Sequence, residues 1–261
     1  MITRERHGPW AIVVGGSEAL GAGFAHRIGE AGINVVLVAR KPEPLEAVAA
    51  SVRAKTGVEV RTLSLDLARD DMLDRIREVT DDVDIGLVVY NAGASHRTGP
   101  FLDGTLDDAL RTARVNAIGH LNLSHHFGTR LVARGRGGII IIGSIAGQAG
   151  GIGIVAYCAA KAFAQVLAEG LWAELKPLGV DVLEVPLGAM NSPAMARIGI
   201  SYSPDRNPAD PDAQAQEILD NLENGPVFVQ PHLREQFARI SGLPRREAVE
   251  AVSGRMIGIK D

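Results

Sequence analysis

The sequence predicts an α/β protein in which a doubly wound parallel sheet of about seven strands carries helices on both faces. Two observations lead to this fold class. Short runs rich in β-branched residues alternate with longer helical stretches, which is typical of strand-helix-strand units. Several of these runs are continuously apolar, as Val35-Val36-Leu37-Val38 is, and strands buried on both faces of a parallel sheet have this composition.

The expected elements alternate along the chain. We expect strands at 10–14, 35–38, 58–63, 85–90, 138–142, 180–186 and 227–230. The spacing of apolar residues predicts helices at 22–31, 45–56, 70–80, 105–133, about 156–175 and 212–223, and a C-terminal helix from about 245. The segment at about 188–211 is rich in Pro, Gly, Ser, Asn and Asp, which favours a loop.

Length and composition narrow the class of protein. A chain of 261 residues in an α/β fold commonly forms one core, so we expect a single domain over 1–261. The formal net charge is -4 without a basic block, which disfavours nucleic acid as a partner. The N-terminus is polar, the apolar runs are shorter than the ~20 residues of a membrane helix, and the lone cysteine suits a reducing compartment. We therefore expect a cytoplasmic protein without a membrane segment.

A glycine-rich turn, residues 15–23, follows the first predicted strand and precedes the first helix. Small residues allow a tight turn there and let backbone amides approach a pyrophosphate at the helix N-terminus. Glycine clusters also occur in ordinary turns, so the position between strand and helix is what favours a dinucleotide-binding Rossmann fold.

The end of the second predicted strand, Ala39-Arg40-Lys41, bears on the choice of dinucleotide. It has no carboxylate for an adenosine ribose and offers two cations that would attract a 2′-phosphate. The alternative is a solvated basic turn, and Glu18 would repel a phosphate if it pointed inward. The pattern favours NADP (NADPH) over NAD.

A hydroxyl, a phenol and an amine follow the fifth predicted strand. Ser144 follows the strand after Gly143, Tyr157 lies thirteen residues on, and Lys161 lies one helical turn beyond Tyr157, on the same helix face. A free tyrosine has a pKa of about 10, so it acts as an acid or base near neutrality only if positive charge stabilises its phenolate. Lys161 can supply that charge. The alternative for each residue alone is an ordinary buried hydrogen bond.

In type, order and spacing, these motifs resemble those of the short-chain dehydrogenase/reductase family over most of the chain. Gly15, Ala19 and Gly21 match the family's Thr-Gly-x-x-x-[Ala/Gly]-x-Gly turn, with Val14 in place of the threonine. Asn91-Ala92-Gly93 matches the end of its Asn-Asn-Ala-Gly motif, with Tyr90 in place of the first asparagine. The two departures leave open how the turn is braced.

Further segments match the family. Asp66-Leu67 resembles its adenine-contacting pair, and Leu187 to Ser192 resembles Pro-Gly-x-Val-x-Thr without the proline. The resemblance implies a catalytic set of Asn116, Ser144, Tyr157 and Lys161. The cofactor contacts that it and the glycine turn together predict are Gly15, Ser17, Glu18, Ala19, Leu20, Gly21, Ala39, Arg40, Lys41, Asp66, Leu67, Asn91, Ala92, Gly93, Tyr157, Lys161, Gly188, Met190 and Ser192.

The first half is similar to the hydroxysteroid and long-chain 3-ketoacyl-CoA reductase branch, through Gly8-Pro9-Trp10-Ala11, Glu18 and Asp84-Ile85-Gly86. This implies an NADPH-preferring carbonyl reductase or alcohol dehydrogenase. Its substrate would be a ketone or secondary alcohol: a steroid, a 3-oxoacyl compound or another largely apolar molecule. Beyond Gly188 the resemblance weakens, so it leaves the substrate and the physiological direction open.

Two other functions remain possible for these residues. One is a catalytically silent NADP-binding regulator of the same fold, and the other is an epimerase or dehydratase. The family also implies a homodimer or homotetramer joined through the helices that carry Asn116 and Tyr157. We expect no metal, because His120, His125 and His126 lack the spacing of a ligand set. His96 would either face the substrate or lie in an exposed loop.

Overall fold

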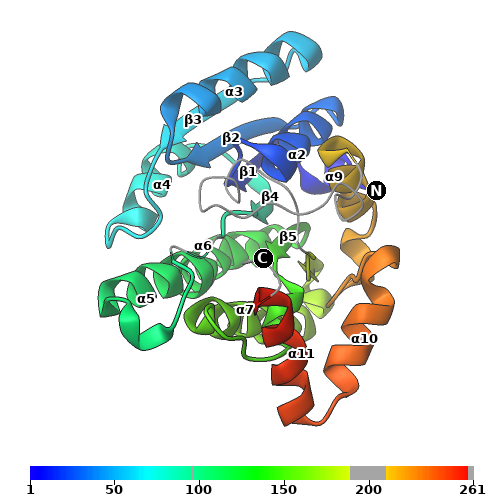
Figure 1. Cartoon of the computed structure of the whole chain (residues 1–261). Helices are drawn as coiled ribbons and strands as arrows, with labels where there is room; N and C mark the ends of the chain where they lie inside the picture. The colour runs from blue at the N-terminus through cyan, green and yellow to red at the C-terminus, as the bar shows by residue number, and fades with distance from the viewer. Residues whose placement is uncertain (94, 96, 189–209, 258–261) are drawn as a thin grey trace.

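The computed structural model describes residues 1–93, 95, 97–188 and 210–257 (Figure 1). Its centre is a six-stranded parallel sheet in the order β3-β2-β1-β4-β5-β6. The strands are β1 (Trp10–Val14), β2 (Asn34–Ala39), β3 (Val60–Ser64), β4 (Ile85–Tyr90), β5 (Gly137–Ile142) and β6 (Val180–Val185). The predicted Rossmann-type fold class is therefore confirmed.

Helices cover both faces of the sheet, over two separate apolar clusters. The α-helices are α1 (Arg4–His7), α2 (Ala19–Glu30), α3 (Pro42–Thr56), α4 (Met72–Thr80), α5 (Leu106–Ala113), α6 (Gly119–Arg134), α7 (Val155–Leu175), α9 (Pro211–Asp220), α10 (Arg234–Gly242) and α11 (Arg245–Ile257). The shorter turns are η1 (Phe101–Asp103), η2 (Arg114–Ile118), η3 (Ile145–Gln148), η4 (Lys176–Leu178), η6 (Leu222–Asn224) and η7 (Pro231–Leu233). One face packs on α2, α3 and α9, and the other on α4, α6 and α7.

The predicted seventh strand at 227–230 is wrong. Only Val227 pairs with the sheet, through a single parallel bridge to Glu184. Pro226 has no N–H for a ladder, and the buried Gln230 bonds to Gln214 at 2.8 Å, which ties the segment to α9. A 3₁₀ turn begins at Pro231, so the chain leaves the sheet after one pair.

The long helix predicted at 105–133 is interrupted. Between α5 and α6 lies one π-helical turn, η2. The Tyr90 hydroxyl donates a hydrogen bond of 2.8 Å to the Val115 carbonyl oxygen within this turn. Gly119 leaves room for that hydroxyl, since a Cβ there would overlap the Tyr90 oxygen. A buried tyrosine at the end of β4 thus occupies the widened turn.

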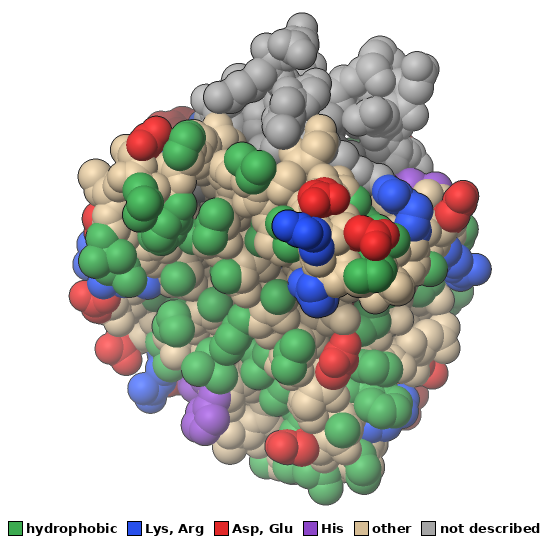
Figure 2. Space-filling model, turned by 60° about the horizontal axis from the view of Figure 1, so that its bottom comes forward, with side chains coloured by type: hydrophobic (Ala, Val, Ile, Leu, Met, Phe, Trp, Pro, Cys, Tyr) green, Lys and Arg blue, Asp and Glu red, His purple; other side chains and the backbone are tan. Residues whose placement is uncertain are grey.

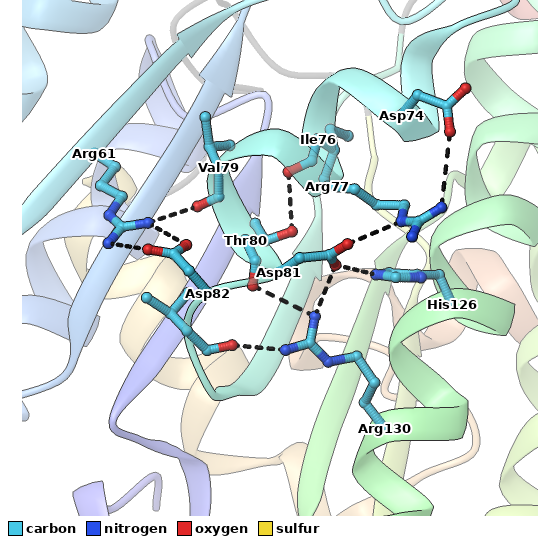
Figure 3. A network of polar contacts seen from close by, with 11 residues as sticks. Arg61, Asp74, Ile76, Arg77, Val79, Thr80, Asp81, Asp82, His126 and Arg130 are labelled. Carbon is cyan, nitrogen blue, oxygen red and sulfur yellow. Dashed lines mark hydrogen bonds and ion pairs between the residues drawn. The ribbon is translucent and has the colours of Figure 1, made fainter.

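Charged residues fix the edge of the sheet where the strands begin. Figure 3 shows Asp81, in the connection from α4 to β4, between Arg77, His126 and Arg130. Its carboxylate lies 3.0 Å from Arg77 Nε and 3.2 Å from Arg130, and Arg130 also donates to the Val83 carbonyl at 2.7 Å. These contacts tie the start of β4 to α6.

None of the helices in the described part of the chain combines the length and apolarity needed to cross a bilayer.

Candidate active site

The segments that the sequence predicts to form the site meet at the edge where the parallel strands end. Strand order runs from β1 through β2 to β3 on one side of the sheet and from β4 through β5 to β6 on the other, so it changes direction between the neighbouring strands β1 and β4. In open α/β sheets, ligands bind in the crevice at such a switch point. The residues that follow the six strands in turn are Gly15, Arg40, Asp66, Asn91, Ser144 and Gly188.

The glycine-rich turn is braced without the threonine and first asparagine of the family motif. Gly15 adopts φ +86° and its N–H donates to the Val38 carbonyl at 2.7 Å. The Asn91 side-chain amide donates to the Gly15 carbonyl at 2.9 Å, and the Asn91 N–H donates to the Val14 carbonyl at 2.9 Å. A Cβ at Gly21 would overlap the Gly15 carbonyl oxygen, so the helix can start this close to the turn only with glycine. Asn91 therefore makes the hydrogen bonds that hold the turn, whereas the Val14 side chain cannot form one and the Tyr90 side chain lies elsewhere.

The start of α2 suits an anion. Ala19 adopts φ +46°, which turns the chain sharply into the helix, and the Glu18 side chain makes no capping hydrogen bond to it. Backbone N–H groups in the first turn of a helix together with the helix dipole attract phosphate. Gly15, Ser17, Ala19, Leu20 and Gly21 surround this turn, so the residues present fit a dinucleotide pyrophosphate.

The adenosine end of the predicted site carries both charges. Arg40 and Lys41 are exposed after β2, and the Ser64 hydroxyl donates to the Arg40 carbonyl at 3.1 Å. Asp66 accepts from the Ala68 N–H at 3.0 Å and from Arg111 at 2.7 Å. Burial opposes ionisation of Asp66, but these hydrogen bonds outweigh it and lower its pKa. Leu67 is buried beside it, and Ala39 is the last residue of β2.

Lys161 is buried at the centre of the site. Its Nζ donates a hydrogen bond of 2.8 Å to the Ile142 carbonyl at the end of β5 and lies 5.7 Å from the Tyr157 ring centroid. Burial lowers the pKa of Lys161 to about 8, although the nearby carboxyl of Glu184 opposes the shift. The i, i+4 spacing on α7 has therefore brought the predicted phenol and amine together.

Asn116 approaches the same ammonium from the π-helical turn. It is fully buried, and its Nδ2 donates to the Thr112 carbonyl at 2.9 Å. A Cβ added at Gly93 would lie 2.6 Å from Asn116 Oδ1 and 2.7 Å from Lys161 Nζ. The three residues come from the β4 end, the π turn and α7, and they converge on one point. Only a residue without a side chain fits between the two polar groups.

Ser144 caps η3, and its Oγ accepts from the Ala146 N–H at 3.2 Å. A Cβ at Gly147 would lie 2.8 Å from the Lys161 carbonyl carbon, so η3 packs tightly on α7. Tyr157 is half-buried and packs against an apolar cluster of η3, α7, α10 and α11. In Figure 1, α10 and α11 lie beside α7.

The three histidines of the predicted helix all lie on α6, in different surroundings. His120 is buried with its ring edge-on to Tyr90, 4.1 Å between centroids, and burial, with Lys161, lowers its pKa. His125 is exposed, and His126 faces Asp81 at 3.5 Å. Gly188 is half-buried after β6. The predictions for His96, Met190, Ser192 and nearly all of the loop at about 188–211 lie outside the described residues.

One ionisable residue was missed. Glu184 lies on β6 with 1% of its surface exposed, and burial raises the pKa of its carboxyl to about 8, although Lys161 opposes the shift. The signal in the sequence was a charged residue, one of two with Asp181, within the apolar run predicted as a strand at 180–186.

Comparison with known proteins agrees with this geometry. The family model described as short chain dehydrogenase matches residues 9–201. The chain is 31% identical over 249 residues to a 7beta-hydroxysteroid dehydrogenase of Clostridium sardiniense, covering 95% of this chain and 90% of that one. It is 34% identical to a very-long-chain 3-oxoacyl-CoA reductase of Neurospora crassa over 68% of this chain, but spans only 54% of that relative.

A solved structure adds a spatial match. The short-chain dehydrogenase from Sphingobium yanoikuyae in complex with NADPH superposes with a TM-score of 0.80 at 31% identity, covering 90% of this chain and 92% of that chain. The resemblance inferred from the motifs is therefore confirmed, including the similarity to hydroxysteroid and 3-oxoacyl-CoA enzymes.

The contact of Gly93 with two polar groups can be tested by denaturation. Gly93→Ala should lower the free energy of unfolding by about 1–3 kcal/mol, because the new methyl group displaces Asn116 or Lys161. Gly170→Ala is the matched control on α7, where a Cβ meets nothing within 4 Å, and should stabilise by about 0.5–1 kcal/mol. Equal stability of Gly93→Ala and the wild type in urea titrations would contradict the tight packing described here.

Proposed function

Because the chain belongs to the short-chain dehydrogenase family of oxidoreductases, we propose that it is an NADPH-preferring carbonyl reductase or alcohol dehydrogenase. It would transfer a hydride between the nicotinamide and a ketone or secondary alcohol. The observation that carries the proposal is the buried Lys161 ammonium, held by the Ile142 carbonyl one helical turn from Tyr157. A buried cation beside a phenol is what a tyrosine acid–base catalyst requires.

The proposed roles follow from the chemistry of each side chain. The Ser144 hydroxyl donates a hydrogen bond to the substrate oxygen, which orients and polarises the carbonyl. The Tyr157 hydroxyl gives its proton to that oxygen in reduction and takes it back in oxidation. Lys161 stabilises the phenolate left on Tyr157. Asn116, beside Lys161 at Gly93, positions the ammonium and leads the proton towards solvent.

The cofactor that fits this site is a nicotinamide dinucleotide. When bound, the reduced form supplies the hydride. The amides at the start of α2 would hold its pyrophosphate, Asp66 and Leu67 its adenine, and Lys161 the ribose next to the nicotinamide. Exposed Arg40 and Lys41, with no carboxylate at the end of β2, support a preference for a 2′-phosphate. The NADPH in a relative of similar structure is consistent with this preference.

A largely apolar substrate is the favoured class. The half-buried Tyr157 packs against a cluster of apolar residues that includes Ile145, Leu233 and Ile240. Such surroundings favour steroid or acyl carbon skeletons over highly charged substrates. The names of the two relatives, a hydroxysteroid dehydrogenase and a 3-oxoacyl-CoA reductase, point to the same class.

We also propose a homodimer or homotetramer joined through α5, α6 and α7. Figure 2 brings the lower side of Figure 1 forward and shows hydrophobic side chains gathered over much of this face. Contiguous exposed apolar side chains commonly mark an interface between proteins. The large exposed apolar residues on these three helices are Leu106, Leu110, Leu121, Val155, Phe163 and Val166.

The phenolic hydroxyl of Tyr157 should be essential for turnover. Tyr157→Phe is expected to lower ketone reduction by roughly 10²–10⁴-fold, because the variant has no proton to donate. NADPH binding and thermal unfolding should stay near the wild-type values. Turnover is followed by the absorbance of NADPH over a panel of steroid and 3-oxoacyl ketones. NADPH binding and thermal unfolding are followed by fluorescence. Tight NADPH binding by the wild type without turnover of any ketone would instead favour the silent regulator.

Arg40 should determine the choice between the two cofactors. Arg40→Asp is expected to weaken NADPH binding by roughly 10–100-fold, because a charge-assisted hydrogen bond to the 2′-phosphate becomes a repulsion. NADH binding should change much less. Lys55→Asp makes the same change in charge at another exposed position, on α3, and should leave both affinities unchanged. Equal losses for NADPH and NADH would remove Arg40 from this role.

The apolar face should hold subunits together. Val166 is 66% exposed on α7, and Val166→Arg is expected to convert the oligomer to a monomer in sedimentation velocity experiments. Leu178→Arg introduces the same side chain at a residue 49% exposed in η4, outside this face, and should leave the oligomer intact. A monomeric wild type, or an oligomer that survives Val166→Arg, would contradict the proposed interface.

A further inference from the structure

Glu184 is a buried carboxyl that the proposed reaction does not use. It lies on β6 with 1% of its surface exposed, and neither carboxylate oxygen has a hydrogen-bond partner among the described residues. An unpaired buried carboxyl is costly, so such a group calls for a physical explanation. Its backbone is fixed on one side by the segment after α9: its N–H donates to the Pro226 carbonyl at 2.8 Å, and its carbonyl accepts from Phe228 at 2.9 Å.

The carboxyl of Glu184 lies beneath the end of β5. Glu184 pairs with Ile141 across the sheet, and Ile141 belongs to the cluster that α6 and α7 cover, so the side chain faces α7. Oε1 occupies the space where a side chain at Gly143 would begin. Gly143 directly follows Ile142, whose carbonyl holds Lys161 Nζ. The peptide unit between Ile142 and Gly143 therefore lies against both Lys161 Nζ and Glu184 Oε1.

We propose that Glu184 is a positioning residue that releases its proton before Lys161 does, and so keeps the Lys161 ammonium charged at alkaline pH. The inference rests on the proposed role of Lys161 in supporting Tyr157. Glu184 touches neither Tyr157 nor the reacting atoms, and it acts only through the charge of Lys161.

The order of proton loss follows from the partners of the two groups. Below about pH 8 both are protonated, because burial raises the pKa of Glu184 and lowers that of Lys161. When the pH rises, one proton leaves the pair for solvent. Loss from Lys161 would leave a neutral amine at the Ile142 carbonyl and a carboxylic acid whose O–H has no acceptor among the described residues. Loss from Glu184 leaves opposite charges on the two groups, whose attraction favours the charged form of each, and keeps a charged donor at the Ile142 carbonyl, so this form is favoured.

Other charges near the pair are few. On α7, Glu169 opposes ionisation of Glu184, but it is only partly buried and accepts a hydrogen bond of 2.8 Å from Gln165. Tyr157 on α7 and His120 on α6 face Lys161, and burial keeps His120 neutral. Neither β5, η3 nor the segment 226–228 contains a titratable side chain. The attraction between Lys161 and Glu184 is therefore the main interaction that favours charge on both groups.

Glu184→Gln tests the proposal, because it keeps the shape of the side chain and removes the acid. In carbon-13 NMR titrations of the protein without cofactor, the wild-type Glu184 carboxyl should titrate before Lys161 Cε. In Glu184→Gln the Lys161 midpoint should fall by about one pH unit, since the carboxylate no longer stabilises the ammonium. The rate at which Glu184→Gln oxidises a 7β-hydroxysteroid with NADP should stay within about twofold of the wild-type rate at pH 6.5, where the wild-type Glu184 is also protonated. At pH 9.5 it should be about tenfold lower than the wild-type rate.

Asp181→Asn is the matched control, because it removes the other buried carboxylate of β6, which is paired with Arg6 and Lys176 at 2.6 Å. It should lower stability and leave the Lys161 titration unchanged. Glu184→Met, which has similar length, replaces Glu184→Gln if the amide impairs folding and should give the same shift. A Lys161 midpoint that is unchanged in both Glu184 variants, or a wild-type Lys161 that titrates before Glu184, overturns the proposal. Absence of steroid oxidation in the wild type counts against the proposed function alone, because the NMR titration needs no substrate.

Discussion

The hydrogen bond from Lys161 Nζ to the Ile142 carbonyl is the constraint on which the rest of the site depends. A buried ammonium must satisfy its donors within the protein, and the free carbonyl at the end of a parallel strand is the group that the sheet offers. The other features then follow from the space around that cation. Gly93 has no side chain, the chain widens into a π-helical turn that presents Asn116, and Gly147 lets η3 pack against α7.

Two departures from the family motif are compensated locally. Val14 cannot hydrogen-bond through its side chain, and Tyr90 points into the π-helical turn instead of towards the glycine-rich turn. The Asn91 side chain joins the end of β4 to the glycine turn, and the Asn91 and Ala92 N–H groups both donate to the Val14 carbonyl just before it. Gly143 and Glu184 also depend on each other: because Gly143, just after β5, has no side chain, the carboxyl of Glu184 on β6 fits beside it.

The sequence predicted those parts of the molecule that depend on local pattern. The six strands, most helices and the helical spacing of Tyr157 and Lys161 follow from periodicity and motif order. The errors arose where contacts between residues far apart in the sequence determine the local structure. The bond between Gln230 and Gln214 draws the expected seventh strand away from the sheet, and the hydroxyl of Tyr90 interrupts a pattern that reads as one helix. Glu184 was overlooked because its importance depends on Lys161, which is distant in sequence.

The packing of Tyr157 has a consequence for how the protein forms during synthesis. Its partly buried ring belongs to a cluster completed by Ala248 and Val252 of α11, and Ser253 Oγ accepts a hydrogen bond of 3.1 Å from the Ile152 N–H, just before α7. In chain order α11 follows all six strands of the sheet. A chain translated only as far as α10 therefore contains the whole sheet but lacks part of the apolar packing around Tyr157.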